Sequence, residues 1–153
     1  MTHYLEISLS PPHPAGMLVP RYDEEVNVLD LGSGIRMPWV YGVDIDGTII
    51  FDLNAERLLV NVEVLIPKKM WRVAPQTTVP YPKRSATLTF SERTIRHKSF
   101  SLPITIYTNR QRTSVLILFD DAMNNNNAWW VKLSHRCFAA VQHGRLVGFL
   151  AWL

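Results

Sequence analysis

Residues with catalytic or metal-binding side chains lie close together in two parts of the chain. His135, Cys137 and His143 near the C-terminus are of the types that bind Zn²⁺. Their spacing matches no standard zinc pattern, so we expect Cys137 to be a small buried apolar side chain beside surface histidines. Gly32-Ser33-Gly34 lacks the third glycine of a phosphate-binding loop, and no serine stands in a nucleophile elbow. The sequence therefore predicts no metal, no cofactor and no catalytic residue.

The second part is VDIDGTII, residues 43–50, in which Asp44 and Asp46 follow an apolar run. This stretch resembles the nucleophile motif of haloacid dehalogenase-like phosphatases. ITIYTN, residues 104–109, is similar to the second motif of that family, and VLILFDD, residues 115–121, to its acidic metal motif. The resemblance implies that Asp44 is a nucleophile and Asp46 an acid and base, at the end of a strand in a parallel sheet.

The chain between the motifs favours hairpins instead. Only residues 110–114 separate ITIYTN from VLILFDD, whereas a parallel neighbour needs a crossover of about a dozen residues or more. Asp46-Gly47 between two apolar runs is a strong signal for a two-residue type I′ turn, because both positions need positive φ. We predict a hairpin that places Val43 opposite Ile50. A phosphatase-like hydrolase remains an alternative function.

Charge is distributed unevenly along the chain. Residues 1–66 hold ten acidic and three basic side chains, whereas residues 67–113, here called the basic middle segment, hold ten basic side chains and one acidic. This segment could bind nucleic acid, or it could pair with the acidic N-terminal segment within a subunit or between subunits. The candidate anion- or nucleic-acid-binding residues are Lys68, Lys69, Trp71, Arg72, Arg93, Arg96, His97, Lys98, Arg110 and Arg112. Candidate stacking platforms are Trp71, Tyr81, Phe90, Phe100 and Tyr107.

The elements that must position these residues are mostly strands. Apolar residues recur at every second position in several windows, and Pro-, Gly- and Asn-rich breaks separate the windows. Between Ala128 and Gln142, by contrast, apolar residues fall at helical spacing, so we predict one helix near 128–142. The predicted fold is mainly β, an antiparallel sandwich or barrel-like structure, with α+β as the alternative.

The length of 153 residues fits a single domain, residues 1–153. That domain could contain two similar β units, at about 26–66 and 115–153, joined by the basic middle segment at 67–113. One cysteine allows no intrachain disulfide, which favours a reducing compartment. The N-terminus lacks a signal-peptide pattern and the apolar C-terminus is too short to span a membrane. We therefore expect a cytoplasmic protein with no membrane contact.

These observations predict a non-catalytic binding, assembly or regulatory module. Its expected partner is a protein surface or another copy of the chain in a homo-oligomer. The alternative that uses the basic middle segment is a nucleic-acid-binding protein, and the alternative that uses Asp44 and Asp46 is the hydrolase.

Overall fold

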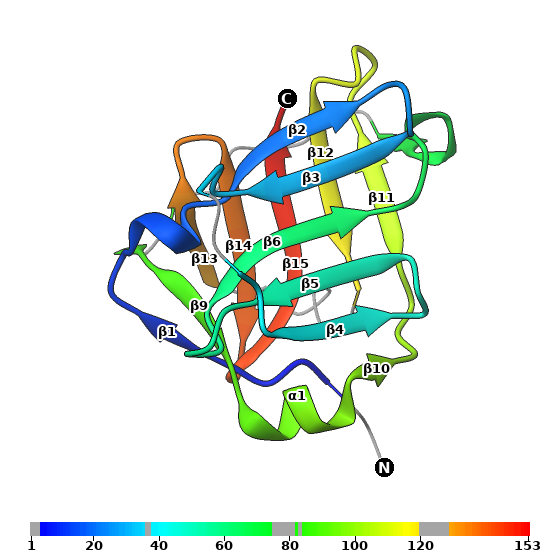
Figure 1. The fold of residues 1–153 in the computed structure, drawn as a ribbon. Coiled ribbons are helices and arrows are strands. Elements are labelled where there is room, and N and C mark those ends of the chain that lie inside the picture. The colour runs from blue at the N-terminus through cyan, green and yellow to red at the C-terminus, as the bar shows by residue number, and fades with distance from the viewer. Residues whose placement is uncertain (1–3, 36–37, 75–81, 83, 120–128) are drawn as a thin grey trace.

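Two β-sheets that pack face to face form the body of the protein (Figure 1). The computed structural model describes residues 4–35, 38–74, 82, 84–119 and 129–153. The six-stranded sheet has the order β10-β4-β5-β6-β3-β2. Its strands are β2 (Val19–Asp23), β3 (Val28–Gly32), β4 (Tyr41–Ile45), β5 (Ile49–Leu53), β6 (Leu59–Val64) and β10 (Ser99–Phe100).

The seven-stranded sheet lies behind it, with the order β7-β11-β12-β15-β14-β13-β8. Its strands are β7 (Arg72–Val73), β8 (Arg84–Ser85), β11 (Thr105–Thr108), β12 (Ser114–Leu118), β13 (Trp129–Ser134), β14 (Cys137–Gln142) and β15 (Arg145–Trp152). A small antiparallel sheet joins β1 (Ile7–Ser10) to β9 (Thr87–Phe90). The helical elements are η1 (Pro14–Gly16), η2 (Lys68–Met70) and α1 (Glu92–His97).

Most neighbouring strands are antiparallel, as the alternating pattern predicts. The parallel neighbours are the short contacts of β10 with β4, β7 with β11 and β8 with β13. Figure 1 shows the strands of the front sheet crossing those of the rear sheet. The prediction of a mainly β antiparallel sandwich is confirmed. No helix in the described part of the chain has the length and apolar composition that a membrane crossing requires.

Apolar side chains from both sheets and from the β1–β9 pair fill the space between the layers. Phe51 on β5 lies at the centre and is fully buried. Its ring centroid is 5.3 Å from that of Phe90, 6.1 Å from that of Phe119 and 6.4 Å from that of Phe149. Each such side chain contributes about 1.5–3 kcal/mol by leaving water. This aromatic cluster ties the two sheets together.

The β4–β5 hairpin forms where the sequence predicts it, but its register is shifted by one residue. Asp46 and Gly47 have positive φ values of 51° and 67°, as expected of the turn. Val43 nevertheless lies opposite Phe51, and not opposite Ile50. The predicted register would have turned Phe51 outward whenever Val43 faced the core, because a slip of one residue reverses the faces of a strand. Burial of both side chains in the core therefore decides the register.

The predicted helix near 128–142 is wrong. The described residues from 129 onward form β13 and β14, joined by a turn at His135 and Arg136. All six residues of β14 are buried, so neither face of this strand is open to solvent, and its two edges pair with β13 and β15. A run buried on both faces shows no alternation, so strand and helix cannot be distinguished by periodicity.

The helix that does form, α1, lies in the basic middle segment beside β4. Ser91 caps its start, since the side-chain oxygen accepts a hydrogen bond from the Thr94 N–H at 3.2 Å. Thr94 is buried and also donates to the carbonyl oxygen of Glu6 at 3.0 Å. The helix has six residues, which is too short for a periodic sequence signal.

The two similar β units proposed from the sequence fall on different sheets. Strands β3 to β6 lie in the six-stranded sheet, and β12 to β15 lie in the seven-stranded sheet. The single domain and the internal similarity of the two units stay predictions.

Candidate binding surface on the six-stranded sheet

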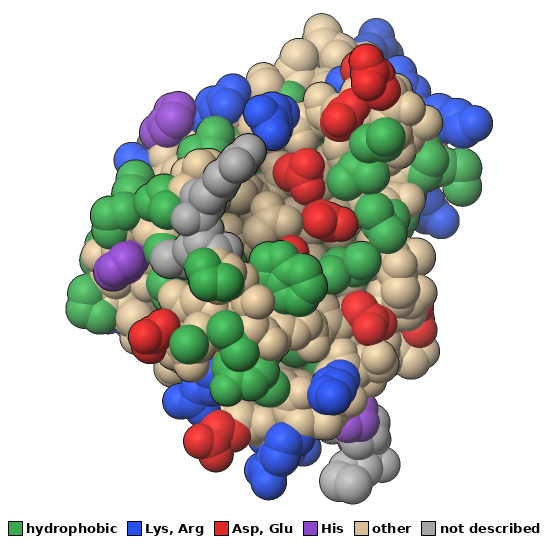
Figure 2. Space-filling model, in the orientation of Figure 1, with side chains coloured by type: hydrophobic (Ala, Val, Ile, Leu, Met, Phe, Trp, Pro, Cys, Tyr) green, Lys and Arg blue, Asp and Glu red, His purple; other side chains and the backbone are tan. Residues whose placement is uncertain are grey.

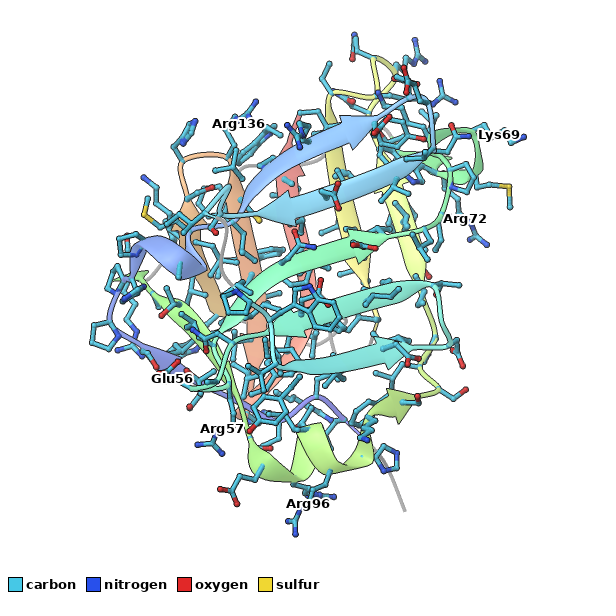
Figure 3. The ribbon with its side chains drawn as sticks, in the orientation of Figure 1. Glu56, Arg57, Lys69, Arg72, Arg96 and Arg136 are labelled. Carbon is cyan, nitrogen blue, oxygen red and sulfur yellow. The ribbon has the colours of Figure 1, made fainter. Side chains whose placement is uncertain are left out.

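The sequence-predicted basic residues lie in two separate groups. Figure 3 shows Lys69 and Arg72 at one end of the molecule and Arg96 at another, on α1. The first group contains Lys68, Lys69, Trp71 and Arg72, on η2 and β7, with Arg110 and Arg112 in the turn after β11. The second group contains Arg93, Arg96, His97 and Lys98, in and after α1.

Two side chains of the first group, those of Trp71 and Lys68, already contact other residues of the chain. Trp71 is only 3% exposed, and its indole N–H donates to the carbonyl oxygen of Ile66 at 3.0 Å. Its ring also forms a T-shaped pair with the ring of Tyr22, with the centroids 5.6 Å apart. The Lys68 ammonium lies 3.3 Å from the Glu24 carboxylate and 4.7 Å from the Tyr22 ring centroid. A buried Trp71 cannot stack on a nucleic acid base.

Three ion pairs are found in the part of the chain that the structure describes. They are Lys68–Glu24 at 3.3 Å, Arg93–Glu6 at 4.0 Å and Arg57–Glu92 at 3.7 Å. Lys68–Glu24 and Arg93–Glu6 pair a base of the basic middle segment with an acid of the N-terminal segment, whereas Arg57–Glu92 joins the same two segments with the charges reversed. Of the proposed stacking platforms, Phe90 and Phe100 are buried, and Tyr81 lies outside the described residues.

The side chains of the phosphatase-like motif have local structural contacts. Asp44 accepts hydrogen bonds from the Gly47 N–H at 3.1 Å and the Ser99 hydroxyl at 2.9 Å. Antiparallel hairpins, β4–β5 and β11–β12, replace the parallel strands that the phosphatases need. Residues 120 and 121 of the acidic motif lie outside the described residues.

The Cys and His residues near the C-terminus are not brought into one site. Cys137 is buried, and burial raises the pKa of its thiol, so the nucleophilic thiolate is suppressed. His135 and His143 are exposed in two different turns. Among the described residues, no three His, Cys, Asp or Glu side chains are grouped to bind a metal ion.

Three carboxylates on the outer face of the six-stranded sheet form a cluster that sequence reasoning missed. Asp30 on β3 lies directly opposite Glu63 on β6, and Asp52 on β5 lies opposite Asn61 in the neighbouring row. Like charges directly opposite one another in a sheet are destabilising. The Asn61 side-chain amide donates to Asp52 at 3.2 Å, and Arg21 lies opposite Asp30 on the other side.

All three carboxyl groups have raised pKa values. Burial is the main cause in each case. The charges of Asp52 and Asp30 raise the pKa of Glu63 further, whereas Arg21 opposes the rise at Asp30. The folded protein therefore holds three partly desolvated negative charges together on an open sheet face.

The outer face of the six-stranded sheet is concave at the cluster of Asp30, Asp52 and Glu63. Two overlapping hollows of about 570 and 320 Å³ share Gly32, Ser33, Gly34, Asn61 and Glu63 in their linings. We call them together the acidic hollow; Asp30 lines one part and Asp52 the other. Gly32 keeps the floor open, since a Cβ atom there would lie 2.6 Å from the Asn61 side-chain oxygen.

Exposed apolar side chains border the acidic hollow. We call Ile35, Trp39, Val40 and Tyr41 the apolar ridge. Trp39 is 62% exposed, and it lines the hollow together with Ile35, Asp52 and Glu63. Figure 2 shows hydrophobic side chains beside acidic ones in the middle of this face. Neighbouring exposed apolar groups with a charged border are typical of an interaction surface.

The comparisons with known proteins place the chain in no family. No protein-family model matches the chain, and no curated protein is significantly similar to it in sequence. The surface must therefore be interpreted from its own geometry.

Replacing Glu63 by Gln should stabilise the fold at neutral pH by about 0.2–1 kcal/mol, the range for one cross-strand pair. Because the pKa values are raised, the folded chain keeps these protons to higher pH than the unfolded chain does. Stability should therefore fall as the pH rises from about 4, where the unfolded carboxyls ionise, through the raised values. Part of this fall should be missing in Glu63→Gln.

Thermal unfolding followed by circular dichroism over a pH series measures this difference. Glu25→Gln is the matched control, because Glu25 is exposed in the β2–β3 turn outside the acidic hollow. Equal stability profiles for the two variants would show that Glu63 bears no excess repulsion.

Proposed function

We propose that the chain is a non-catalytic binding module whose six-stranded sheet face binds a basic segment of a protein partner. The observation that carries this proposal is the position of the exposed Trp39 at the border of a hollow with clustered carboxylates. The apolar ridge supplies contact area, and the carboxylates supply attraction for Lys or Arg. Trp and Tyr are the aromatic side chains most enriched among residues that dominate binding energy.

Electrostatics support a cationic ligand. Asp30, Asp52 and Glu63 repel one another in the free chain, and burial has already removed part of their hydration. A cation placed among them relieves the repulsion, whereas an anion increases it. Trp39 can add a cation–π contact with the same Lys or Arg side chain. A basic side chain next to an apolar one therefore matches the surface better than a nucleic acid does.

The shape of the surface supports a protein segment. The hollow is open to solvent and borders a ridge of four apolar side chains, so it suits a chain that continues across the surface. A partner segment with alternating apolar and basic side chains can place its apolar side chains on the ridge and its basic side chains in the acidic hollow.

The test is selection of a random displayed peptide library on the immobilised wild-type chain, followed by calorimetry with synthetic versions of the enriched peptides. We expect the enriched peptides to pair Lys or Arg with an apolar residue. Trp39→Ala should weaken their binding by about tenfold or more, as expected of a dominant contact. Glu63→Gln should weaken it as well, while stabilising the fold.

Glu25→Gln is again the matched control and should leave the affinity unchanged. Enriched peptides without basic residues, or full affinity in Trp39→Ala and Glu63→Gln, would refute the proposal. A single-stranded oligonucleotide serves as the second probe. Tight, salt-sensitive retention of the oligonucleotide that disappears in Arg93→Glu/Arg96→Glu would favour the nucleic-acid alternative instead.

A further inference from the structure

A second hollow lies at the other end of the apolar ridge, next to α1. Its volume is about 610 Å³, within the usual range for ligand sites. We call it the α1 hollow; its lining residues are Tyr41, Ala55, Glu56, Arg57, Glu92, Ile95 and Arg96. Figure 3 shows Arg57 and Arg96 at the edge of the molecule near α1.

The position of Arg57 in this hollow is fixed by its backbone. Arg57 has a left-handed backbone with φ of 67° in the turn between β5 and β6. The buried Asn54 holds this turn, because its side-chain oxygen accepts the N–H groups of Glu56 and Leu58, each at 3.0 Å. The Arg57 carbonyl oxygen also accepts the Phe90 N–H at 2.9 Å. The constrained turn therefore fixes the point from which the Arg57 side chain leaves the backbone at the edge of the hollow.

The α1 hollow is lined by two arginines and two glutamates, and its guanidinium groups can bind an anion. Arg57 meets Glu92 at 3.7 Å, which is long for an ion pair, and the Glu92 side chain is 79% exposed. Arg96 makes no ion pair with any residue that the structure describes. Glu56 also lines the hollow and is exposed. An incoming carboxylate would thus compete with the exposed Glu92 for Arg57 and meet Arg96 without competition from an existing pair.

The apolar ridge connects the two hollows. Trp39 lines the acidic hollow, and Tyr41, two residues further along the chain, lines the α1 hollow. In extended chain two residues span about 7 Å. The surface therefore presents three zones in a fixed order, which are the acidic hollow, the apolar ridge and the α1 hollow with its two arginines and two glutamates.

We infer that the partner segment carries the complementary order, with a basic residue for the acidic hollow, an apolar residue for the ridge and a carboxylate for Arg57 and Arg96. This inference rests on the proposed function and extends it. The acidic hollow favours one direction of the segment, because the reversed segment would bring its carboxylate to the clustered carboxylates of Asp30, Asp52 and Glu63. Arg57 and Arg96 in the α1 hollow and the carboxylates of the acidic hollow thus set the orientation of the partner together, while the acidic hollow and Trp39 supply most of the affinity.

The experiment compares two synthetic peptides, one enriched from the library on the wild-type chain and one in which its acidic residue is replaced by the amide. Calorimetry with the acidic peptide should show about two- to fivefold weaker binding to Arg96→Glu, the range for an exposed ion pair. Glu92→Gln should bind the acidic peptide more tightly, because it removes the competitor for Arg57. The amide peptide should be insensitive to Glu92→Gln.

Arg110→Glu is the matched control, because it makes the same charge change in the β11–β12 turn, away from α1. Melting curves of all variants check that the fold is kept. The inference is overturned if the enriched peptides lack an acidic residue at a constant spacing from the basic one, or if Arg96→Glu affects both peptides equally. In those cases the proposed function still stands, provided that Trp39→Ala and Glu63→Gln weaken binding.

Discussion

Replacing Phe51 by Ala should lower the free energy of unfolding by about 3–5 kcal/mol. Phe51 is fully buried on β5, and its ring meets three other phenylalanines, from β9, from the residue directly after β12 and from β15. Removing the Phe51 ring leaves a void between the two sheets. The neighbouring rings are held on different strands, so they cannot move together to fill this void. Small domains are stable by only about 5–15 kcal/mol, so this loss is a large fraction of the total.

Urea unfolding followed by fluorescence measures the change for Phe51→Ala. Ile50→Ala is the matched control, because Ile50 is the neighbouring residue on the outer face of the same strand and is only partly buried. We expect the control to lose much less stability. Equal losses for both variants would mean that the core does not lie between the sheets at β5.

Replacing Gly148 by Ala should also destabilise the protein, by about 1–3 kcal/mol or more. A Cβ atom on Gly148 would lie 3.0 Å from a methyl carbon of Leu118 and in overlap with the carbonyl oxygen of Ile117. The carbonyl belongs to β12, the neighbour of β15, so it cannot move away without distorting the ladder between these strands. The central strands of the seven-stranded sheet would have to separate.

Gly42→Ala provides the comparison, because nothing lies within 4 Å of the Cβ position at Gly42 on β4. Its φ needs no glycine, so the alanine should be neutral or stabilise the fold by about 0.4–1 kcal/mol through the unfolded state. Thermal unfolding of the two variants gives the result directly. A Gly148→Ala protein as stable as Gly42→Ala would contradict the close approach of β12 and β15.

The sequence predicted the class of the fold because burial of one strand face leaves an alternating pattern. β6 is the best example, with buried and partly exposed residues in turn from Val60 to Val64. The pattern failed for β14, which is buried on both faces. The alternating pattern also could not predict the β4–β5 register. Other strands bury Phe51, and this burial outweighs the two-residue register that the Asp46-Gly47 turn favours.

The candidate site was harder to predict, because its charges come together only through strand pairing. Asp30, Asp52 and Glu63 stand on three strands, and each looks in the sequence like an ordinary outward-facing polar residue. The basic middle segment gave a strong sequence signal, yet its chain passes through η2 and α1, which carry its charges to separate places. Basic residues that are close in the sequence therefore lie apart in the structure. The three carboxylates of the acidic hollow are distant in the sequence, so no local pattern predicts that they meet.

Most of the apolar ridge belongs to the connection between β3 and β4, not to a strand. Ile35, Trp39 and Val40 lie after Gly32 and before Tyr41, outside the strands themselves, although the Val40 N–H donates to the Leu53 carbonyl oxygen of β5 at 2.7 Å. Substitutions in this loop can alter what the surface recognises with little cost to folding. Recognition and folding can therefore change independently, so the same scaffold can acquire new specificities through a few loop positions.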